Sequence, residues 1–140
     1  MRADALGMFW EDHPAIKARG EKTFVPRTLP PIPDTGWVMP TEFPRLDAAT
    51  EICIDCETYD PELLTHGHGW GRGVGHIVGI AVGVEGARWY FPMRHTLGNN
   101  LPPEAVLQWC RDTLQNARQP KVFANAQYDL GWLKQEGVDI

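Results

Sequence analysis

The sequence is poor in cysteine, in long apolar runs and in positive charge. Three cysteines among 140 residues are too few for a disulfide framework. The N-terminus shows no apolar signal region, and no apolar run is long enough to span a bilayer. These absences predict a soluble, cytoplasmic protein with no membrane partner.

The charge balance restricts how the chain could meet nucleic acid. Thirteen Lys and Arg stand against 18 Asp and Glu, which gives a net charge of −5. A protein that holds nucleic acid by a general basic surface is therefore not expected. A nuclease remains possible, because its acidic residues can bind metal ions that in turn meet the phosphate.

Proline divides the chain into two parts. Seven of the 12 prolines fall in residues 1–49, where they prevent regular helix and central strand. We expect this part to be an extended arm, partly polyproline II, and residues 50–140 to form one α/β domain. The arm's large apolar residues should lie along the domain surface or on a partner: Phe9, Trp10, Phe24, Trp37 and Phe43.

An apolar run at residues 52–54 ends in two carboxylates one residue apart. Asp55 and Glu57 point the same way if residues 50–57 form a strand. Two like charges at the end of a buried strand repel each other unless a cation lies between them. A divalent-metal site and a pair of solvated surface acids are both compatible with this stretch.

The glycine-rich stretch at residues 66–75 matches neither a dinucleotide fingerprint nor a phosphate-binding loop. It leads toward a strand and not toward a helix, so we expect a mobile loop beside the acidic pair. Arg72 is the cation in it best suited to touch a phosphate. His66 and His68 could bind a metal, although loop histidines are more often simply solvated.

The remaining pattern alternates strands and helices. Residues 77–84 and 87–91 predict a hairpin with a tight turn at Glu85-Gly86. Helical spacing of apolar residues predicts a helix over 103–116, and a short strand should follow at 121–124.

A third carboxylate, Asp129, follows that short strand. Asn125 can cap the next helix, and Asp129 lies four residues further along on the same helical face. If the short strand runs parallel to the strand at 50–57, Asp129 lies at the same sheet edge as Asp55 and Glu57. An exposed helix acid is the alternative.

These residues resemble a known family. Residues 55–58 (Asp-Cys-Glu-Thr) are similar to the first motif of the DEDD superfamily of 3′–5′ exonucleases, and residues 125–129 (Asn-Ala-Gln-Tyr-Asp) to its second motif. The hairpin end at 89–95 is similar to the proofreading domain of family A, polymerase I-type DNA polymerases of phages or bacteria. The resemblance implies a ribonuclease H-like fold: a mixed sheet with an antiparallel meander and parallel strands, flanked by helices.

The resemblance also implies a two-metal mechanism on the 3′ end of single-stranded DNA. Two Mg²⁺ or Mn²⁺ ions, roughly 3.5–4 Å apart, would bridge the scissile phosphate. Asp55 would contact both ions, Glu57 the nucleophile-side ion and the terminal 3′ hydroxyl, and Asp129 the second ion. Oxygen ligands suit these hard cations.

Other residues of the two motifs would bind the substrate. By the same resemblance, Asn125 and Tyr128 would position the scissile phosphate and the neighbouring nucleotides, and Thr58 would lie near the terminal nucleotide. The family's third motif, a tyrosine or histidine followed by an aspartate, has no counterpart in the sequence. We therefore expect an N-terminal fragment, incomplete at its C-terminus, with a DNA polymerase as its downstream partner and little or no activity alone.

Three alternatives stay open to different degrees. The spacing of Cys53 and Cys56 is compatible with zinc, but strand alternation would place the two sulfurs on opposite faces. A ribonuclease D-like RNA exonuclease shares both motifs. A catalytically silent module could bind nucleic acid or dock a partner through the arm.

Overall fold

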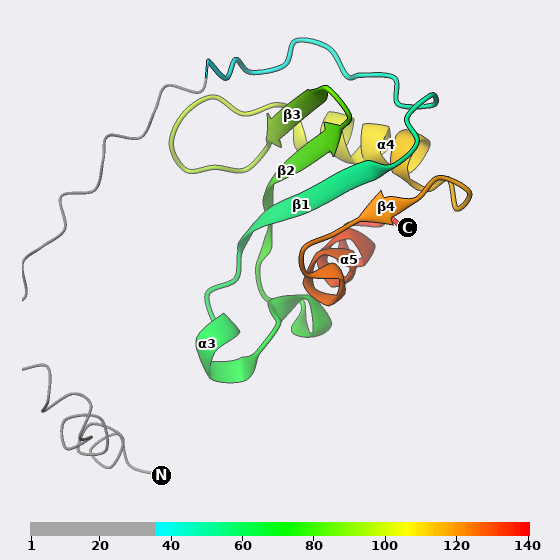
Figure 1. Ribbon diagram of the computed structural model, residues 1–140. Helices are drawn as coiled ribbons and strands as arrows, with labels where there is room; N and C mark the ends of the chain where they lie inside the picture. Colours follow the sequence, from blue (N-terminus) through cyan, green and yellow to red (C-terminus); the bar gives the residue numbers. More distant parts are fainter. Residues whose placement is uncertain (1–35) are drawn as a thin grey trace, which may run out of the picture. The chain divides into compact units, whose positions relative to one another are not determined.

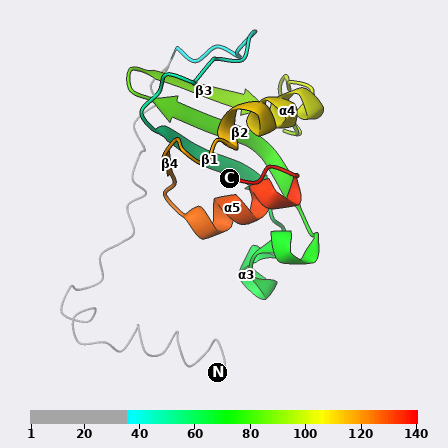
Figure 2. The same ribbon diagram turned by 90° about the vertical axis from the view of Figure 1, so that its right-hand side faces the viewer.

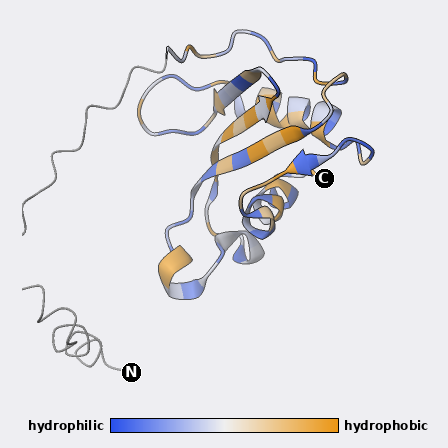
Figure 3. Ribbon diagram, in the orientation of Figure 1, coloured by the Kyte–Doolittle hydropathy of each residue, from blue (hydrophilic) through white to orange (hydrophobic). Residues whose placement is uncertain are grey.

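The computed structural model describes residues 36–140, and its sheet is built around strand β1 (Ile52–Tyr59). Buried and exposed side chains alternate along β1, because successive side chains of a strand point to opposite faces. Ile52, Ile54 and Cys56 are buried. Figure 3, which colours residues by hydropathy, shows hydrophobic and hydrophilic bands along β1. Asp55 and Glu57 therefore lie on the face opposite the apolar core.

Four strands form the sheet that the described residues contain. β2 (His76–Val84) and β3 (Ala87–Pro92) form the expected hairpin, and β2 pairs antiparallel with β1. β4 (Lys121–Val122) pairs parallel with β1 on its other side, which gives the order β3-β2-β1-β4 (Figure 1). This mixed sheet with flanking helices confirms the predicted ribonuclease H-like α/β fold class.

Helices α4 (Pro103–Leu114) and α5 (Ala126–Gln135) cover one face of the sheet (Figures 1 and 2). Their apolar side chains share one cluster with the inward residues of β1, β2 and β3. As predicted, the spacing of the α4 residues places their apolar side chains in this core. The fully buried members with the largest side chains are Trp132, Phe91, Ile52, Ile77, Ile80, Leu114 and Leu133.

The segment between β1 and β2 is more ordered than the sequence predicted. It contains α3 (Leu63–His66) and the 3₁₀-helix η1 (Gly69–Arg72). η1 packs on α5, where the Trp70 indole lies directly over Gly131. A Cβ at Gly131 would overlap that ring, so the contact needs glycine. The sequence did not predict these short helical turns, which the tertiary contact with α5 organises.

Several bounds differ slightly from the sequence prediction. β1 starts and ends two residues later than expected, and β4 ends at Val122, since its parallel ladder pairs only Ile52 and Cys53 before the chain turns toward α5. α4 ends at Leu114, two residues before the expected position. Within residues 36–140, the structure contains no helix of the length and apolarity needed to cross a membrane.

The compact unit that contains the sheet begins at Trp37, within the part of the sequence assigned to the arm. Phe43 packs against Phe91 and Trp109, with ring centroids 5.4 and 5.7 Å away, and Leu46 is buried. The Trp109 indole N–H donates to the Pro44 carbonyl at 3.0 Å. Residues 37–49 thus form part of this unit. The expectations for Phe9, Trp10, Phe24 and most of the proline run lie outside the described residues.

Candidate functional site

Asp129 lies against the carboxyl-terminal half of β1. Its side chain is 2% exposed, and its Oδ1 accepts a hydrogen bond of 3.1 Å from the Cys56 backbone N–H. The parallel ladder with β4 reaches β1 only at Ile52 and Cys53. Beyond that point the edge of β1 needs another acceptor, because buried backbone donors are costly to leave unpaired. The first turn of α5 supplies it through Asp129.

Two carboxylates interact electrostatically at this edge. Burial raises the pKa of Asp129 above its ordinary value, the hydrogen bond from Cys56 opposes that shift, and the charge of Asp55 adds to it. The negative charge of Asp129 is therefore disfavoured both by lost hydration and by a neighbouring carboxylate. A bound cation would relieve both penalties.

Glu57 shares the exposed face of β1 with Asp55, and the register of β1 against β2 shifts between Glu57 and Thr58. Irregularities of this kind re-aim side chains. Within residues 36–140, however, no three His, Cys, Asp or Glu side chains gather closely enough to hold a metal ion. The oxygen donors of Asp55 and Asp129 fit a hard divalent cation chemically, but the structure does not assemble a three-ligand centre with Glu57.

The structure brings Thr58 and Tyr128 together. Their hydroxyl oxygens are 2.8 Å apart, and the Tyr128 hydroxyl also donates to Asp60 at 3.2 Å. The same Asp60 oxygen accepts the Gly69 backbone N–H at 3.0 Å. Asp60 thus joins the end of β1, η1 and α5. Asp60 was not among the predicted site residues, although an acid two residues beyond Thr58 was a usable signal.

Asn125 occupies the N-cap position of α5, as predicted, but its side chain makes no capping hydrogen bond. Its backbone has φ −135° and ψ 74°, and the first-turn N–H groups of Tyr128 and Asp129 use its carbonyl, at 3.0 and 3.2 Å. The expected side-chain cap was therefore wrong. The exposed Asn125 lies at the same end of the helix as Asp129, four residues away.

Arg72 is engaged inside the segment between β1 and β2. Its guanidinium donates to Glu62 Oε2 at 2.5 Å and to the Gly67 carbonyl at 3.1 Å. The hydrogen bond from Arg72 lowers the pKa of Glu62. The contact of Arg72 with a phosphate stays a prediction. His66 bonds to Thr65, and neither loop histidine belongs to a group of three potential metal ligands within the described part of the chain.

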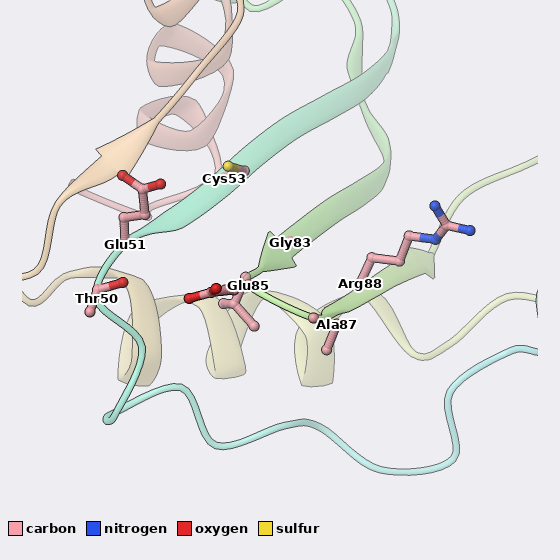
Figure 4. A pocket seen from close by; sticks show the side chains of 9 residues that line it. Thr50, Glu51, Cys53, Gly83, Glu85, Ala87 and Arg88 are labelled. Atoms are coloured by element: carbon pink, nitrogen blue, oxygen red, sulfur yellow. The ribbon is translucent and has the colours of Figure 1, made fainter.

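A pocket of about 760 Å³ lies at the opposite end of β1, around the turn between β2 and β3 (Figure 4). Cys53 lies in β1, and Glu51 directly precedes that strand. Glu85 and Arg88 come from the hairpin of β2 and β3. The predicted carboxylates do not line it.

Cys53 is exposed and Cys56 is buried, which places the two thiols on opposite faces and leaves the zinc interpretation without support.

Comparison with known proteins gives one informative likeness. No protein-family model matches the chain. Over 110 residues, the chain is 38% identical to a DNA-directed DNA polymerase of Pseudomonas phage M6. The match covers 76% of this chain but only 17% of that polymerase. The chain is thus similar to one part of a phage DNA polymerase.

Proposed function

We propose that this chain carries the first part of a 3′–5′ exonuclease domain that acts on single-stranded DNA ends, alongside a DNA polymerase. The observation that carries the proposal is the buried Asp129 carboxylate, held at the end of β1 by the Cys56 N–H and in electrostatic contact with Asp55. A fold that buries one acid beside another sacrifices stability, which natural proteins do chiefly at functional sites. The likeness to a phage DNA-directed DNA polymerase supports DNA as the substrate.

The proposed chemistry needs a divalent cation, Mg²⁺ or Mn²⁺, which when bound supplies an activated water and stabilises charge on the phosphate. Asp55 and Asp129 would hold the cation with their carboxylate oxygens, and Glu57 would join them from the exposed face of β1. The Cys56 N–H keeps Asp129 Oδ1 in place at the edge of β1.

Tyr128 would contact the end of the DNA strand. Its hydroxyl is bound by both Thr58 and Asp60, so the ring has a defined position at the end of β1. An aromatic ring fixed in this way provides a face on which a nucleobase can stack. Asn125, exposed at the start of α5, would reach the adjoining phosphate.

The test is a single-turnover assay on single-stranded DNA labelled at its 5′ end, with excess protein and Mn²⁺. We expect slow stepwise shortening from the 3′ end that Asp55→Ala and Asp129→Ala abolish. Asp47→Ala, at an exposed aspartate outside the site, is the matched control and should retain activity. Shortening that is equally fast in Asp55→Ala would refute the proposal. A matched RNA strand tests the ribonuclease D-like alternative, which predicts faster cleavage of RNA.

One observation favours a second candidate, a catalytically silent module that binds nucleic acid or docks a partner. Within residues 36–140, no three potential ligands gather closely enough for a metal ion. Calorimetric titration with Mn²⁺ separates the two candidates. Binding that Asp129→Asn removes supports the exonuclease, whereas DNA binding without any Mn²⁺ binding supports the silent module.

A further inference from the structure

The hydroxyl of Tyr90 lies on the exposed face of the sheet beside Glu57. Tyr90 belongs to β3, and its side chain crosses the β2 residue Gly79, which is the register partner of Glu57. A Cβ built at Gly79 would overlap the Tyr90 hydroxyl, so this hydroxyl occupies the place of a side chain opposite Glu57. Cβ atoms of directly opposed residues lie about 4.5–5.5 Å apart. The hydroxyl is therefore within reach of the Glu57 carboxylate.

The Tyr90 hydroxyl is held in place by a hydrogen bond to the segment that follows β3. It is hydrogen-bonded to Nε2 of His95, five residues along the chain. His95 is itself fixed by Asn100: its backbone N–H donates to the Asn100 side-chain oxygen, and the Asn100 amide donates to the His95 carbonyl, both at 2.9 Å. Trp37 adds an edge contact to the Tyr90 ring, with centroids 6.2 Å apart.

We propose that Tyr90 and His95 are positioning residues for Glu57: the His95 ring holds the Tyr90 hydroxyl over Gly79, and that hydroxyl orients the Glu57 carboxylate for cation and 3′-end binding. This inference rests on the proposed function for the role of Glu57. The hydrogen-bond directions are consistent, because Nε2–H of His95 can donate to the hydroxyl oxygen. The hydroxyl hydrogen is then left for the carboxylate, which only accepts.

The exposure of Glu57 indicates what this arrangement would contribute. Glu57 is exposed and has a flexible side chain, so it loses conformational entropy when a ligand fixes it. A hydroxyl that restricts its rotamers beforehand reduces that loss. Residues that orient a metal ligand without contacting the metal typically change metal affinity or activity by about 10–100-fold when they are removed.

The first experiment measures the orientation of Glu57 without metal or DNA. Three-bond NMR couplings report the side-chain torsions of Glu57 in the 140-residue protein. We expect one dominant rotamer in the wild type and averaged couplings in Tyr90→Phe, which keeps the ring and removes only the hydroxyl. Tyr59→Phe, at an exposed tyrosine of the same sheet, is the control and should leave the couplings unchanged. Averaged couplings already in the wild type would overturn the inference, whatever the chain's activity.

The role of His95 is tested by two substitutions. His95→Gln retains an N–H donor and should preserve the Glu57 couplings, whereas His95→Ala should average them. A merely structural role of His95 would instead give unfolding midpoints that fall in both variants while the Glu57 couplings stay fixed. That result would overturn the inference for His95.

The second experiment measures Mn²⁺ affinity by calorimetry. We expect Tyr90→Phe to weaken binding about 10–100-fold in the wild-type background and to have no effect in Glu57→Gln, where the group to be positioned has lost its charge. Equal weakening in both backgrounds would refute positioning through Glu57 while the proposed function stands. Failure of the wild type to bind Mn²⁺ would refute the proposed function, and the Glu57 couplings would then decide the inference on their own.

Discussion

Replacing Asp129 with Asn should stabilise the fold in the absence of metal. The Asp129 carboxylate is 2% exposed, and its pKa is raised by burial and by the charge of Asp55 despite the opposing hydrogen bond from Cys56. The Asn side-chain oxygen can still accept that bond, which is 3.1 Å long. The substitution therefore removes a buried charge and its repulsion at nearly constant shape.

The magnitude follows from three effects. Two unit charges 4 Å apart repel by about 4 kcal/mol near a protein surface and by about 1 kcal/mol in water, and the exposed Asp55 favours the lower figure. Exchanging a charge-assisted hydrogen bond for a neutral one loses about 1 kcal/mol. These two effects nearly cancel. The net gain is therefore the desolvation cost of the buried Asp129 carboxylate, which the neutral Asn side chain avoids; that cost is also the main cause of the raised pKa of Asp129. We expect the free energy of unfolding to rise by about 1 kcal/mol, or about 4 °C in Tm.

The gain should depend on pH in a defined direction. A carboxyl group whose pKa is raised in the folded state penalises folding when it is ionised and not when it is protonated. The penalty is absent below the unfolded-state pKa of about 3.9 and develops as the pH rises through the folded-state pKa. The advantage of Asp129→Asn is therefore largest near pH 7–8 and shrinks toward pH 4.

Urea unfolding followed by tryptophan fluorescence, in EDTA at several pH values, measures this difference. Asp47→Asn removes an exposed charge and should change the midpoint little. A variant that is less stable than the wild type at pH 7.5, or a difference that does not vary with pH, would refute the reasoning. Saturating Mn²⁺ should reverse the order, because a ligand at 100 times its Kd stabilises the wild type by about 2.7 kcal/mol.

Three further predictions concern the rest of the fold. Gly131→Ala should cost about 1–3 kcal/mol, because its Cβ overlaps the Trp70 ring; an unchanged urea midpoint would contradict that contact. Arg94→Ala removes two hydrogen bonds, of 2.5 and 3.0 Å, from the half-buried carboxylate of Glu136 and should cost about 2–4 kcal/mol in thermal unfolding. Ellman's reagent at pH 8 should modify only Cys53 in the native protein and all three cysteines in urea. The reason is that Cys56 and Cys110 are buried, and burial raises the pKa of both thiols. Rapid reaction of more than one native thiol would refute this prediction.

The resemblance to a known family predicted the mixed sheet, and the local signals of the sequence agree with it. The apolar run at residues 52–54 predicted β1, the Glu85-Gly86 turn predicted the hairpin, and helical spacing predicted α4. Parallel pairing of β1 with β4 followed from the strand–helix–strand order. The short helical turns between β1 and β2 were not predicted, because they are supported by the contact of Trp70 with Gly131, and these two residues are distant in sequence.

By itself, the sequence determined which acids share a face of β1, because side-chain direction in a strand depends only on residue spacing. Only the tertiary structure decided how Asp129 meets them: through the N–H of Cys56, exposed where the β4 ladder stops. The contacts of Asp60 were likewise decided by tertiary packing, which brings residues from separate elements within hydrogen-bonding range. No spacing rule along the chain encodes such distances.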